Sequence, residues 1–292
     1  MKIGMVGLGR MGGNMVERLR RDGHEVIGYS RSNTQQAKNL ADLVSQLPKP
    51  RVVWLMVPAG DVTQRNVDEM IKLLEPGDVL IDGGNSNFRD SIRRAQEVSA
   101  HGILWADSGT SGGIWGLTEG YSLMIGASEE AFRIIEPLAK TLAPPNGYAH
   151  VGPPGAGHFV KMVHNGIEYG MMQSFAEGFE IMRASKEFDL DLHQVAQVWR
   201  QGSVVRSWLL DLAAAAFEKD PDLEQLKGFA EDSGEGRWTV LEAVNTGVAA
   251  PAISAALYAR FVSQQEDSFA MKVIAALRRE FGGHAVKTAA GE

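Results

Sequence analysis

Residues 2–13 read KIGMVGLGRMGG, and this stretch decides the fold. An apolar run leads directly into Gly7, Gly9 and Gly12, which have the spacing G-x-G-x-x-G. The first glycine permits a tight turn, the second lets the backbone approach a pyrophosphate, and the third lets helix and strand pack closely. The N-terminus of the following helix attracts phosphate charge. Because the motif stands between a strand and a helix, it predicts a dinucleotide-binding turn; the alternative is a glycine-rich turn without a ligand.

Short apolar runs alternate with helical stretches through the first half of the chain. Apolar runs at 25–30, 51–58, 78–84 and 102–113 are separated by helical patterns such as residues 62–74. Strands that are apolar on both faces and linked by helices are typical of a parallel sheet covered on both sides.

Proline and glycine punctuate residues 144–157, and helical periodicity dominates after that break. We therefore predict an α/β Rossmann-type dinucleotide-binding domain at residues 1–154. An all-α domain for substrate binding and dimerisation is expected to follow at residues 155–292.

Composition limits the classes of function. The chain has 29 basic and 36 acidic residues, so its net charge of −7 argues against general nucleic-acid binding. It has no cysteine, which excludes a disulfide framework, a thiolate metal site and a cysteine nucleophile. No run is long and apolar enough to span a bilayer, and Met1 leads straight into an apolar strand. We expect a soluble cytoplasmic protein with no nucleic-acid or membrane partner.

The second predicted strand ends at Ser30, Arg31 and Ser32, where an NAD-preferring site usually has an acidic residue. A carboxylate would repel the 2′-phosphate of NADP, whereas a guanidinium and hydroxyls would bind it. This pattern favours NADP over NAD. The alternative is that Arg31 stacks on the adenine or faces solvent.

A polar stripe interrupts the apolar helix that opens the second half. Lys161, His164, Asn165, Glu168 and Tyr169 stand at i, i+3, i+4, i+7 and i+8, so they share one face of a helix. The alternative is a solvated face, but Lys161 and Glu168 are too far apart in sequence for an ordinary helical ion pair. We therefore expect this face to be aimed at a substrate.

A lysine and a glutamate on one face of a helix can act as the base and the acid of one reaction. A lysine in apolar, dry surroundings can have a lowered pKa and act as a base. A glutamate in the same cleft can be kept protonated and act as an acid. Together with a hydride acceptor in the first domain, the pair outlines a dehydrogenase.

Five stretches carry a resemblance to a known family: GHFVKMVHNGIEYGMM (157–172), IDGGNSNFRD (81–90), SGTSGG (108–113), DSGEGRWT (232–239) and FGGH (281–284). They resemble the motifs of decarboxylating 6-phosphogluconate dehydrogenases, within the β-hydroxyacid dehydrogenase superfamily, over nearly the whole chain. The chain lacks most of the C-terminal helical extension of the long form and is similar to the short bacterial form. Short forms often use NAD and often carry an aspartate after the second strand. That aspartate is absent here, so the resemblance leaves the preference between NAD and NADP open.

The resemblance implies oxidative decarboxylation of 6-phosphogluconate to ribulose 5-phosphate and CO2 with reduction of NAD(P), in the pentose phosphate pathway and gluconate utilisation. Lys161 would take the proton of the 3-hydroxyl as hydride leaves C3, and return it to the C3 oxygen during decarboxylation. Glu168 would protonate C1 of the enediol. No metal is expected, because the 3-keto group is itself the electron sink.

The resemblance also implies the contacts of both ligands, and it implies a homodimer or a higher homo-oligomer. It assigns binding of the phosphorylated sugar acid to Asn85, Ser111, Gly112, Gly113, His164, Asn165, Tyr169, Arg237, Thr239, Arg260, Arg278 and His284. The cofactor is expected to contact Gly7, Gly9, Arg10, Met11, Gly12, Ser30, Arg31, Ser32, Val57, Pro58 and Asn85.

Two other functions compete with this interpretation. A non-decarboxylating β-hydroxyacid dehydrogenase, of the 3-hydroxyisobutyrate or tartronate semialdehyde type, would share the glycine loop and the lysine with an asparagine four residues later. It would not be expected to have His164 and Glu168 in this arrangement or a set of phosphate-binding arginines. A catalytically silent NADP-binding module would not need Lys161 and Glu168 together.

Overall fold

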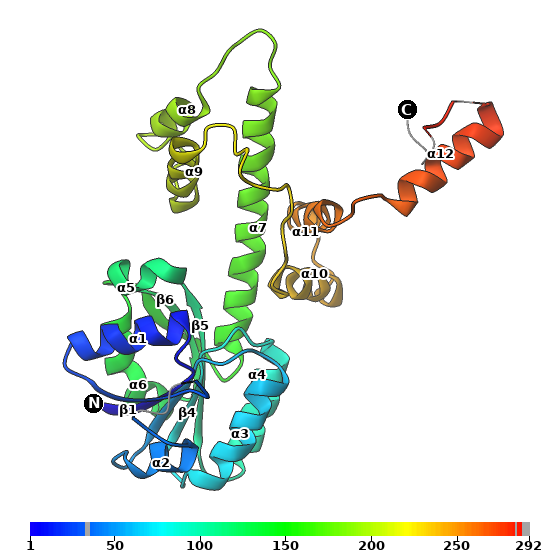
Figure 1. The fold of residues 1–292 in the computed structure, drawn as a ribbon. Coiled ribbons are helices and arrows are strands. Elements are labelled where there is room, and N and C mark those ends of the chain that lie inside the picture. The colour runs from blue at the N-terminus through cyan, green and yellow to red at the C-terminus, as the bar shows by residue number, and fades with distance from the viewer. Residues whose placement is uncertain (33–35, 284, 288–292) are drawn as a thin grey trace. The chain divides into compact units, whose positions relative to one another are not determined.

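The structure is a computed structural model that describes residues 1–32, 36–283 and 285–287. Its contacts divide the chain into two compact units, Met1–Asn165 and Gly166–Glu292 (Figure 1). The predicted functional boundary between residues 154 and 155 stays a prediction.

The first unit is built on a seven-stranded sheet, counted over the described residues, in the order β2-β1-β3-β4-β5-β6-β7. Neighbouring strands run parallel except β5 and β6, which are antiparallel. The segment between those two strands has only a 3-10 turn at Gly113–Trp115 and a short helix at Gly116–Glu119, too short for the crossover that parallel strands need. The strands are β1 (Lys2–Val6), β2 (Glu25–Tyr29), β3 (Val52–Leu55), β4 (Val79–Asp82), β5 (Leu104–Ser111), β6 (Ser122–Ala127) and β7 (Tyr148–Gly152).

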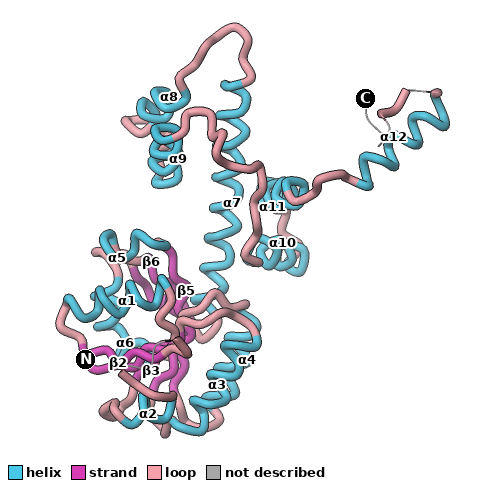
Figure 2. Tube along the Cα trace, viewed as in Figure 1, coloured by secondary structure: helices cyan, strands magenta, loops and turns pink. Residues whose placement is uncertain are grey.

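Helices cover both faces of this sheet, which confirms the predicted α/β class (Figure 2). Residues alternate between the faces along each strand. Met5 and Trp54 pack with α1 and α6 on one face, and Leu55 and Leu80 pack with α2, α3 and α4 on the other. The helices are α1 (Arg10–Arg21), α2 (Leu40–Ser45), α3 (Asp61–Leu73), α4 (Phe88–Ser99), η1 (Gly113–Trp115), α5 (Gly116–Glu119) and α6 (Glu129–Leu142).

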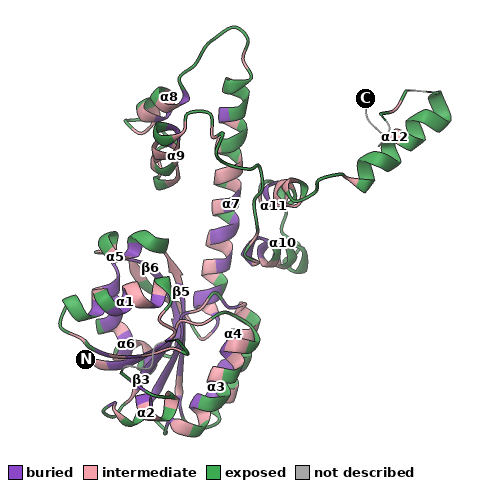
Figure 3. Ribbon diagram, viewed as in Figure 1, coloured by how far each residue is buried: buried purple, intermediate pink, exposed green. Residues whose placement is uncertain are grey.

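The second unit consists of helices joined by loops, with no strand among its described residues, as predicted. α7 (Ala156–Arg183) begins in the first unit and continues into the second. Phe179 of α7 packs with Leu210 and Phe217 of α9, and Tyr169 packs with Ala256 and Leu257 of α11. Figure 3 shows buried residues along α7 and a largely exposed α12. The other helices are α8 (Leu192–Trp199), α9 (Trp208–Lys219), α10 (Glu235–Thr246), α11 (Pro251–Ser263) and α12 (Phe269–Gly282). None of the helices in the described ranges is both long and apolar enough to cross a lipid bilayer.

Candidate active site

The glycine turn lies where the strand order reverses, between β1 and β3, which is the usual ligand position in doubly wound sheets. Gly7 has a φ of +97°, and a Cβ there would overlap the Met56 carbonyl. A Cβ on Gly12 would overlap the Gly7 carbonyl, whereas Gly9 faces open space. α1 starts at Arg10 with no side-chain cap from Gly9 and no acidic residue in its first turn. Its first amides are therefore suited to a pyrophosphate, and the residues fit a dinucleotide.

The residues expected to contact the rest of the cofactor lie on both sides of this turn. Ser30, Arg31 and Ser32 follow β2, with Arg31 exposed and the two serine hydroxyls 3.3 Å apart. Val57 and Pro58 follow β3, and the Pro58 carbonyl accepts a hydrogen bond from Thr63 Oγ1 at 3.0 Å. This placement suits the predicted contacts, which stay predictions.

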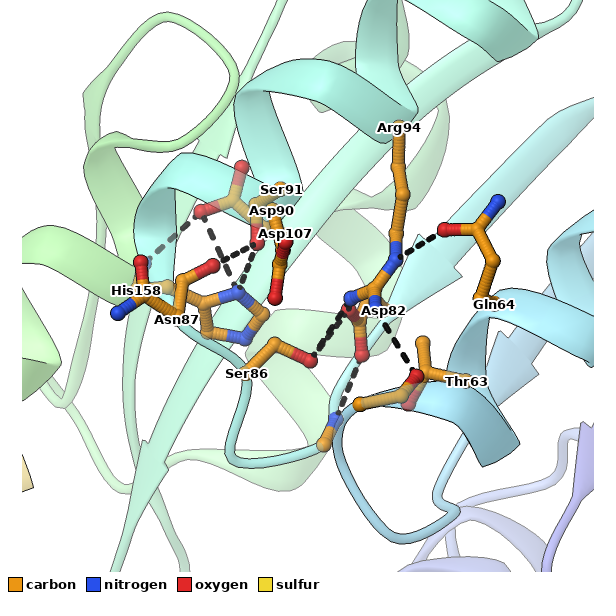
Figure 4. A network of polar contacts seen from close by, with 12 residues as sticks. Thr63, Gln64, Asp82, Ser86, Asn87, Asp90, Ser91, Arg94, Asp107 and His158 are labelled. Carbon is orange, nitrogen blue, oxygen red and sulfur yellow. Dashed lines mark hydrogen bonds and ion pairs between the residues drawn. The ribbon is translucent and has the colours of Figure 1, made fainter. Parts of the chain in front are cut away.

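Asp82, the last residue of β4, organises the loop that carries Asn85. Its carboxylate is fully buried and accepts hydrogen bonds from the Gly84 amide at 3.0 Å and from Ser86 Oγ at 2.8 Å (Figure 4). Arg94 of α4, which is also buried, lies with its Nη1 3.3 Å from the same carboxylate and balances its charge. Asn85 stands exposed between the two held residues. The loop is thus shaped by a residue that sequence reasoning did not single out.

Asp107 of β5 holds the start of α7, as Asp82 holds the loop that carries Asn85. It is paired in register with Asp82 on the adjacent strand, and it is also fully buried. Its Oδ1 accepts the Gly155 amide at 2.5 Å, and its Oδ2 accepts the His158 amide at 2.8 Å. Burial raises the pKa of the Asp107 carboxyl, while His158 and these two amides act to lower it. A charged residue inside an apolar strand was the signal in the sequence that could have identified both aspartates.

Lys161 follows one helical turn after this attachment. A Cβ on Gly109 of β5 would overlap the Lys161 side chain, so the two elements meet there without any intervening side chain. Lys161 Nζ donates a hydrogen bond to Asn165 Oδ1, and His164 Nδ1 lies 3.0 Å from the same oxygen. Asn165 is buried. The structure therefore brings together three of the five residues of the predicted stripe within the first unit.

The other two stripe residues, Glu168 and Tyr169, belong to the second unit. The Tyr169 hydroxyl accepts a hydrogen bond from the Ser233 amide at 3.1 Å. The Arg260 guanidinium stacks on the Tyr169 ring at 3.5 Å from its centroid, and its Nη1 donates to the Glu231 carbonyl at 2.8 Å. The aromatic ring thus joins α7 to α11 and to the segment that precedes α10.

Two further predicted phosphate ligands lie on α10. Arg237 Nε donates to Asp232 Oδ2 at 2.6 Å and its Nη2 donates to Asp232 Oδ1 at 3.0 Å. This guanidinium lowers the pKa of Asp232. Thr239 is buried and donates to the Glu235 carbonyl at 2.8 Å.

The remaining predicted substrate contacts are spread over both units. Ser111 ends β5 and is paired with Ser122 of β6, and Gly112 and Gly113 follow with positive φ values of 125° and 52°. Arg278 is exposed on α12, whereas His284 lies outside the described residues. No described group of three His, Cys, Asp or Glu side chains is placed to hold a metal ion.

Comparisons with known proteins agree along the whole chain. The model of the NAD binding domain of 6-phosphogluconate dehydrogenase matches residues 2–152, and that of the 6-phosphogluconate dehydrogenase C-terminal domain matches residues 157–288. The Bacillus subtilis protein YqeC is 45% identical over 98% of this chain and 99% of its own length. A Haloferax volcanii 6-phosphogluconate dehydrogenase, named as NAD(+)-dependent and decarboxylating, is 42% identical over 98% of each chain.

Solved structures give the same result. Plasmodium falciparum 6-phosphogluconate dehydrogenase superposes with a TM-score of 0.83 at 30% identity, over 100% of this chain and 67% of that one. A Mycobacterium tuberculosis 3-hydroxyisobutyrate dehydrogenase has a TM-score of 0.70 at 23% identity, over 95% of this chain and 99% of that one. At that identity the second likeness indicates the fold alone.

Proposed function

The chain belongs to the 6-phosphogluconate dehydrogenase family, and on this premise we propose that it oxidises and decarboxylates 6-phosphogluconate to ribulose 5-phosphate in the pentose phosphate pathway. The observation that carries the proposal is the meeting of Lys161, His164 and Asn165 around one amide oxygen at the start of α7. A lysine held by a buried asparagine, on a helix seated against the nucleotide-binding sheet, is suited to proton transfer beside a hydride acceptor.

Lys161 is the proposed base. It takes the proton of the substrate's 3-hydroxyl during oxidation at C3, for which a bound nicotinamide would supply the hydride acceptor. Asn165 fixes the direction of the lysine ammonium group by accepting its hydrogen bond, and His164 supports this because it contacts the same Asn165 oxygen. During decarboxylation Lys161 returns the proton to the C3 oxygen, so that the electrons left by CO2 are accommodated as an enediol.

Glu168 is the proposed acid. It stands seven residues after Lys161 in the same continuous helix, and it gives the proton that C1 of the enediol needs to become ribulose 5-phosphate. Asn85, Ser111, Gly112 and Gly113 are the proposed contacts of the carboxylate end of the sugar acid. Asn85 also lies at the proposed border with the nicotinamide.

The second unit holds the proposed phosphate site. Arg260 stacks on Tyr169, and Arg237 lies beside the neighbouring Phe261 ring at 4.3 Å from its centroid. Guanidinium groups can bind phosphate through two hydrogen bonds each. We assign the phosphate to these two arginines and to the Tyr169 hydroxyl, with Thr239, Arg278 and His284 as further proposed contacts.

The family gives NAD(P) as the cofactor, and we propose that NADP is preferred. The exposed Arg31 with its two flanking serines would bind a 2′-phosphate. The Haloferax volcanii relative is named as NAD(+)-dependent, whereas the Plasmodium falciparum structure is described in complex with NADP+.

We also propose a cytoplasmic homodimer or higher homo-oligomer. Many large apolar side chains of the second unit are exposed, among them Phe269 at 78% and Phe281 at 79%. Large apolar side chains left exposed in this number support an interface with another copy of the chain.

The test is reduction of NADP and, separately, of NAD with 6-phosphogluconate while CO2 release is followed. We expect reduction with stoichiometric CO2, and we expect Lys161→Ala to abolish turnover while NADP binding is nearly unchanged. Reduction without CO2 would point instead to a non-decarboxylating β-hydroxyacid dehydrogenase. Binding of NADP without any reduction would point to a silent module.

A further inference from the structure

The first turn of α7 is capped by a side chain from another element. Asp107 of β5 accepts hydrogen bonds from the amides of Gly155 and His158, which lie 48 and 51 residues later in the chain. Gly155 directly precedes the helix and His158 is its third residue. These are the positions whose amides lack partners within a helix, and an N-cap side chain normally binds there. A buried carboxylate of the sheet therefore replaces the local cap.

A second attachment holds the same turn from α4. His158 Nδ1 lies 2.6 Å from Ser91 Oγ, and both side chains are buried (Figure 4). The turn is thus fixed through its backbone by Asp107 and through a side chain by Ser91. Both partners belong to regular elements of the first unit, β5 and α4.

The proposed base follows immediately. Lys161 is three residues after His158, which places it about 4.5 Å further along the helix axis. Gly109, against which its side chain packs, is two residues after Asp107 and therefore on the same face of β5. The same short piece of strand contacts both the capped turn and Lys161, so any shift of the turn reaches the lysine directly.

We propose that Asp107, assisted by Ser91, is a positioning residue for Lys161. Neither side chain touches the reacting atoms; both act by fixing the first turn of α7 against β5 and α4. This inference rests on the proposed function, because it gives Lys161 the role of base. A displacement of about 1 Å at a reacting group can lower a rate about 100-fold, so a loosened turn is expected to impair catalysis more than binding.

The test compares three variants of the full chain. Asp107→Asn keeps the shape but has one acceptor oxygen, and its amide group then faces one of the two backbone N–H groups. We expect kcat to fall about 10- to 100-fold with KM for 6-phosphogluconate and NADP within about 3-fold of wild type. Amide hydrogen exchange over residues 155–165 is expected to become faster. Ser91→Ala should show the same changes at smaller size.

Ser108→Ala is the matched control. Ser108 is buried on the opposite face of the same strand, and its hydroxyl has no hydrogen-bond partner among the described residues. We expect this variant to keep wild-type kcat and exchange.

Three results would overturn the proposal. They are a kcat in Asp107→Asn within about 2-fold of wild type, a loss no larger than in Ser108→Ala, or a loss with unchanged exchange over the first turn. Burial raises the pKa of Asp107, so the neutral asparagine is not expected to lower stability by removing the charge. If Asp107→Asn does not fold, the test rests on Ser91→Ala. Wild-type kcat together with wild-type amide hydrogen exchange over residues 155–165 in that variant would overturn the proposal.

The proposed function fails separately. A wild-type chain that reduces neither cofactor with 6-phosphogluconate would remove the role of Lys161. Hydrogen exchange over residues 155–165 would still report whether Asp107 holds the turn.

Discussion

Arg237 and Asp232 form an ion pair with two parallel hydrogen bonds, in which the carboxylate is nearly buried and the guanidinium is half exposed. The carboxylate thereby fixes the orientation of the arginine proposed to bind the substrate phosphate. A bidentate pair is specific in geometry as well as favourable in energy. The phosphate would meet a guanidinium that is already oriented.

Replacing Arg237 should weaken substrate binding. A hydrogen bond to a charged group contributes about 1.5–3 kcal/mol, so Arg237→Ala should raise KM for 6-phosphogluconate about 10- to 100-fold with a smaller effect on kcat. Steady-state kinetics measure this. Arg183→Ala is the matched control, because Arg183 is an exposed arginine paired with Asp222 in the same unit. An equal KM in both variants would exclude Arg237 from the phosphate site.

The same ion pair should make stability depend on pH. Arg237 lowers the pKa of Asp232, so the pair stabilises the fold above the unfolded value of about 3.9 and loses this contribution as pH falls towards the lower native value. We expect the difference in free energy of unfolding between wild type and Asp232→Asn to shrink from about pH 6 to about pH 3, measured with urea. Asp222→Asn, which breaks an exposed pair, should show a much flatter difference. A constant difference for Asp232→Asn would contradict the linkage.

Arg94 should contribute more to stability than its neighbour in sequence. Its side chain is 1% exposed and lies against the fully buried Asp82, so Arg94→Ala leaves a buried carboxylate without its cation. We expect a loss of about 3–5 kcal/mol in the free energy of unfolding by urea. Arg93→Ala removes an arginine that is 46% exposed and should lose about 0–1 kcal/mol. Similar losses in the two variants would mean that Asp82 is not held by Arg94.

Gly109 should be intolerant of any side chain. Because an added Cβ would overlap Lys161, Gly109→Ala should displace the lysine and lower kcat by about 10-fold or more. Gly178→Ala is the control in α7, since nothing lies within 4 Å of its added Cβ. That variant should keep its kcat and gain up to about 1 kcal/mol in stability. Wild-type kcat in Gly109→Ala would show that the helix can move aside without harm.

Arg31 should distinguish the two cofactors. If its guanidinium binds the 2′-phosphate, Arg31→Ala should raise KM for NADP about 10- to 100-fold and leave KM for NAD within about 3-fold. Arg133→Ala removes the same charge from an exposed position on α6 and should change neither value. An equal rise for NADP and NAD would mean that Arg31 does not read the 2′-phosphate.

Local patterns in the sequence predict much of this molecule, and contacts between distant residues account for what they miss. The glycine spacing predicts the turn after β1 because its two close approaches, at Gly7 and Gly12, involve only the turn itself and the end of the adjacent strand β3. The reversed direction of β6 depends on a connection too short for a crossover, which periodicity does not report.

The buried aspartates illustrate the same limit within the candidate site. Asp82 and Asp107 were not singled out from the sequence, although both are charges inside apolar runs, and their roles depend on partners from other elements. The stripe on α7 is foreseen by helical spacing. Helical spacing does not show that Lys161 and His164 both contact Asn165 Oδ1, because those contacts depend on the positions of the side chains.

The division of the chain inside α7 has a practical consequence for recombining relatives of this family. The proline-rich segment before the helix looks like the natural place to join the front of one homologue to the back of another. A joint there would pair Asp107 and Gly109 from one parent with Gly155, His158 and Lys161 from the other. Chimeras joined after Asn165 would instead inherit strand, cap and lysine from a single parent.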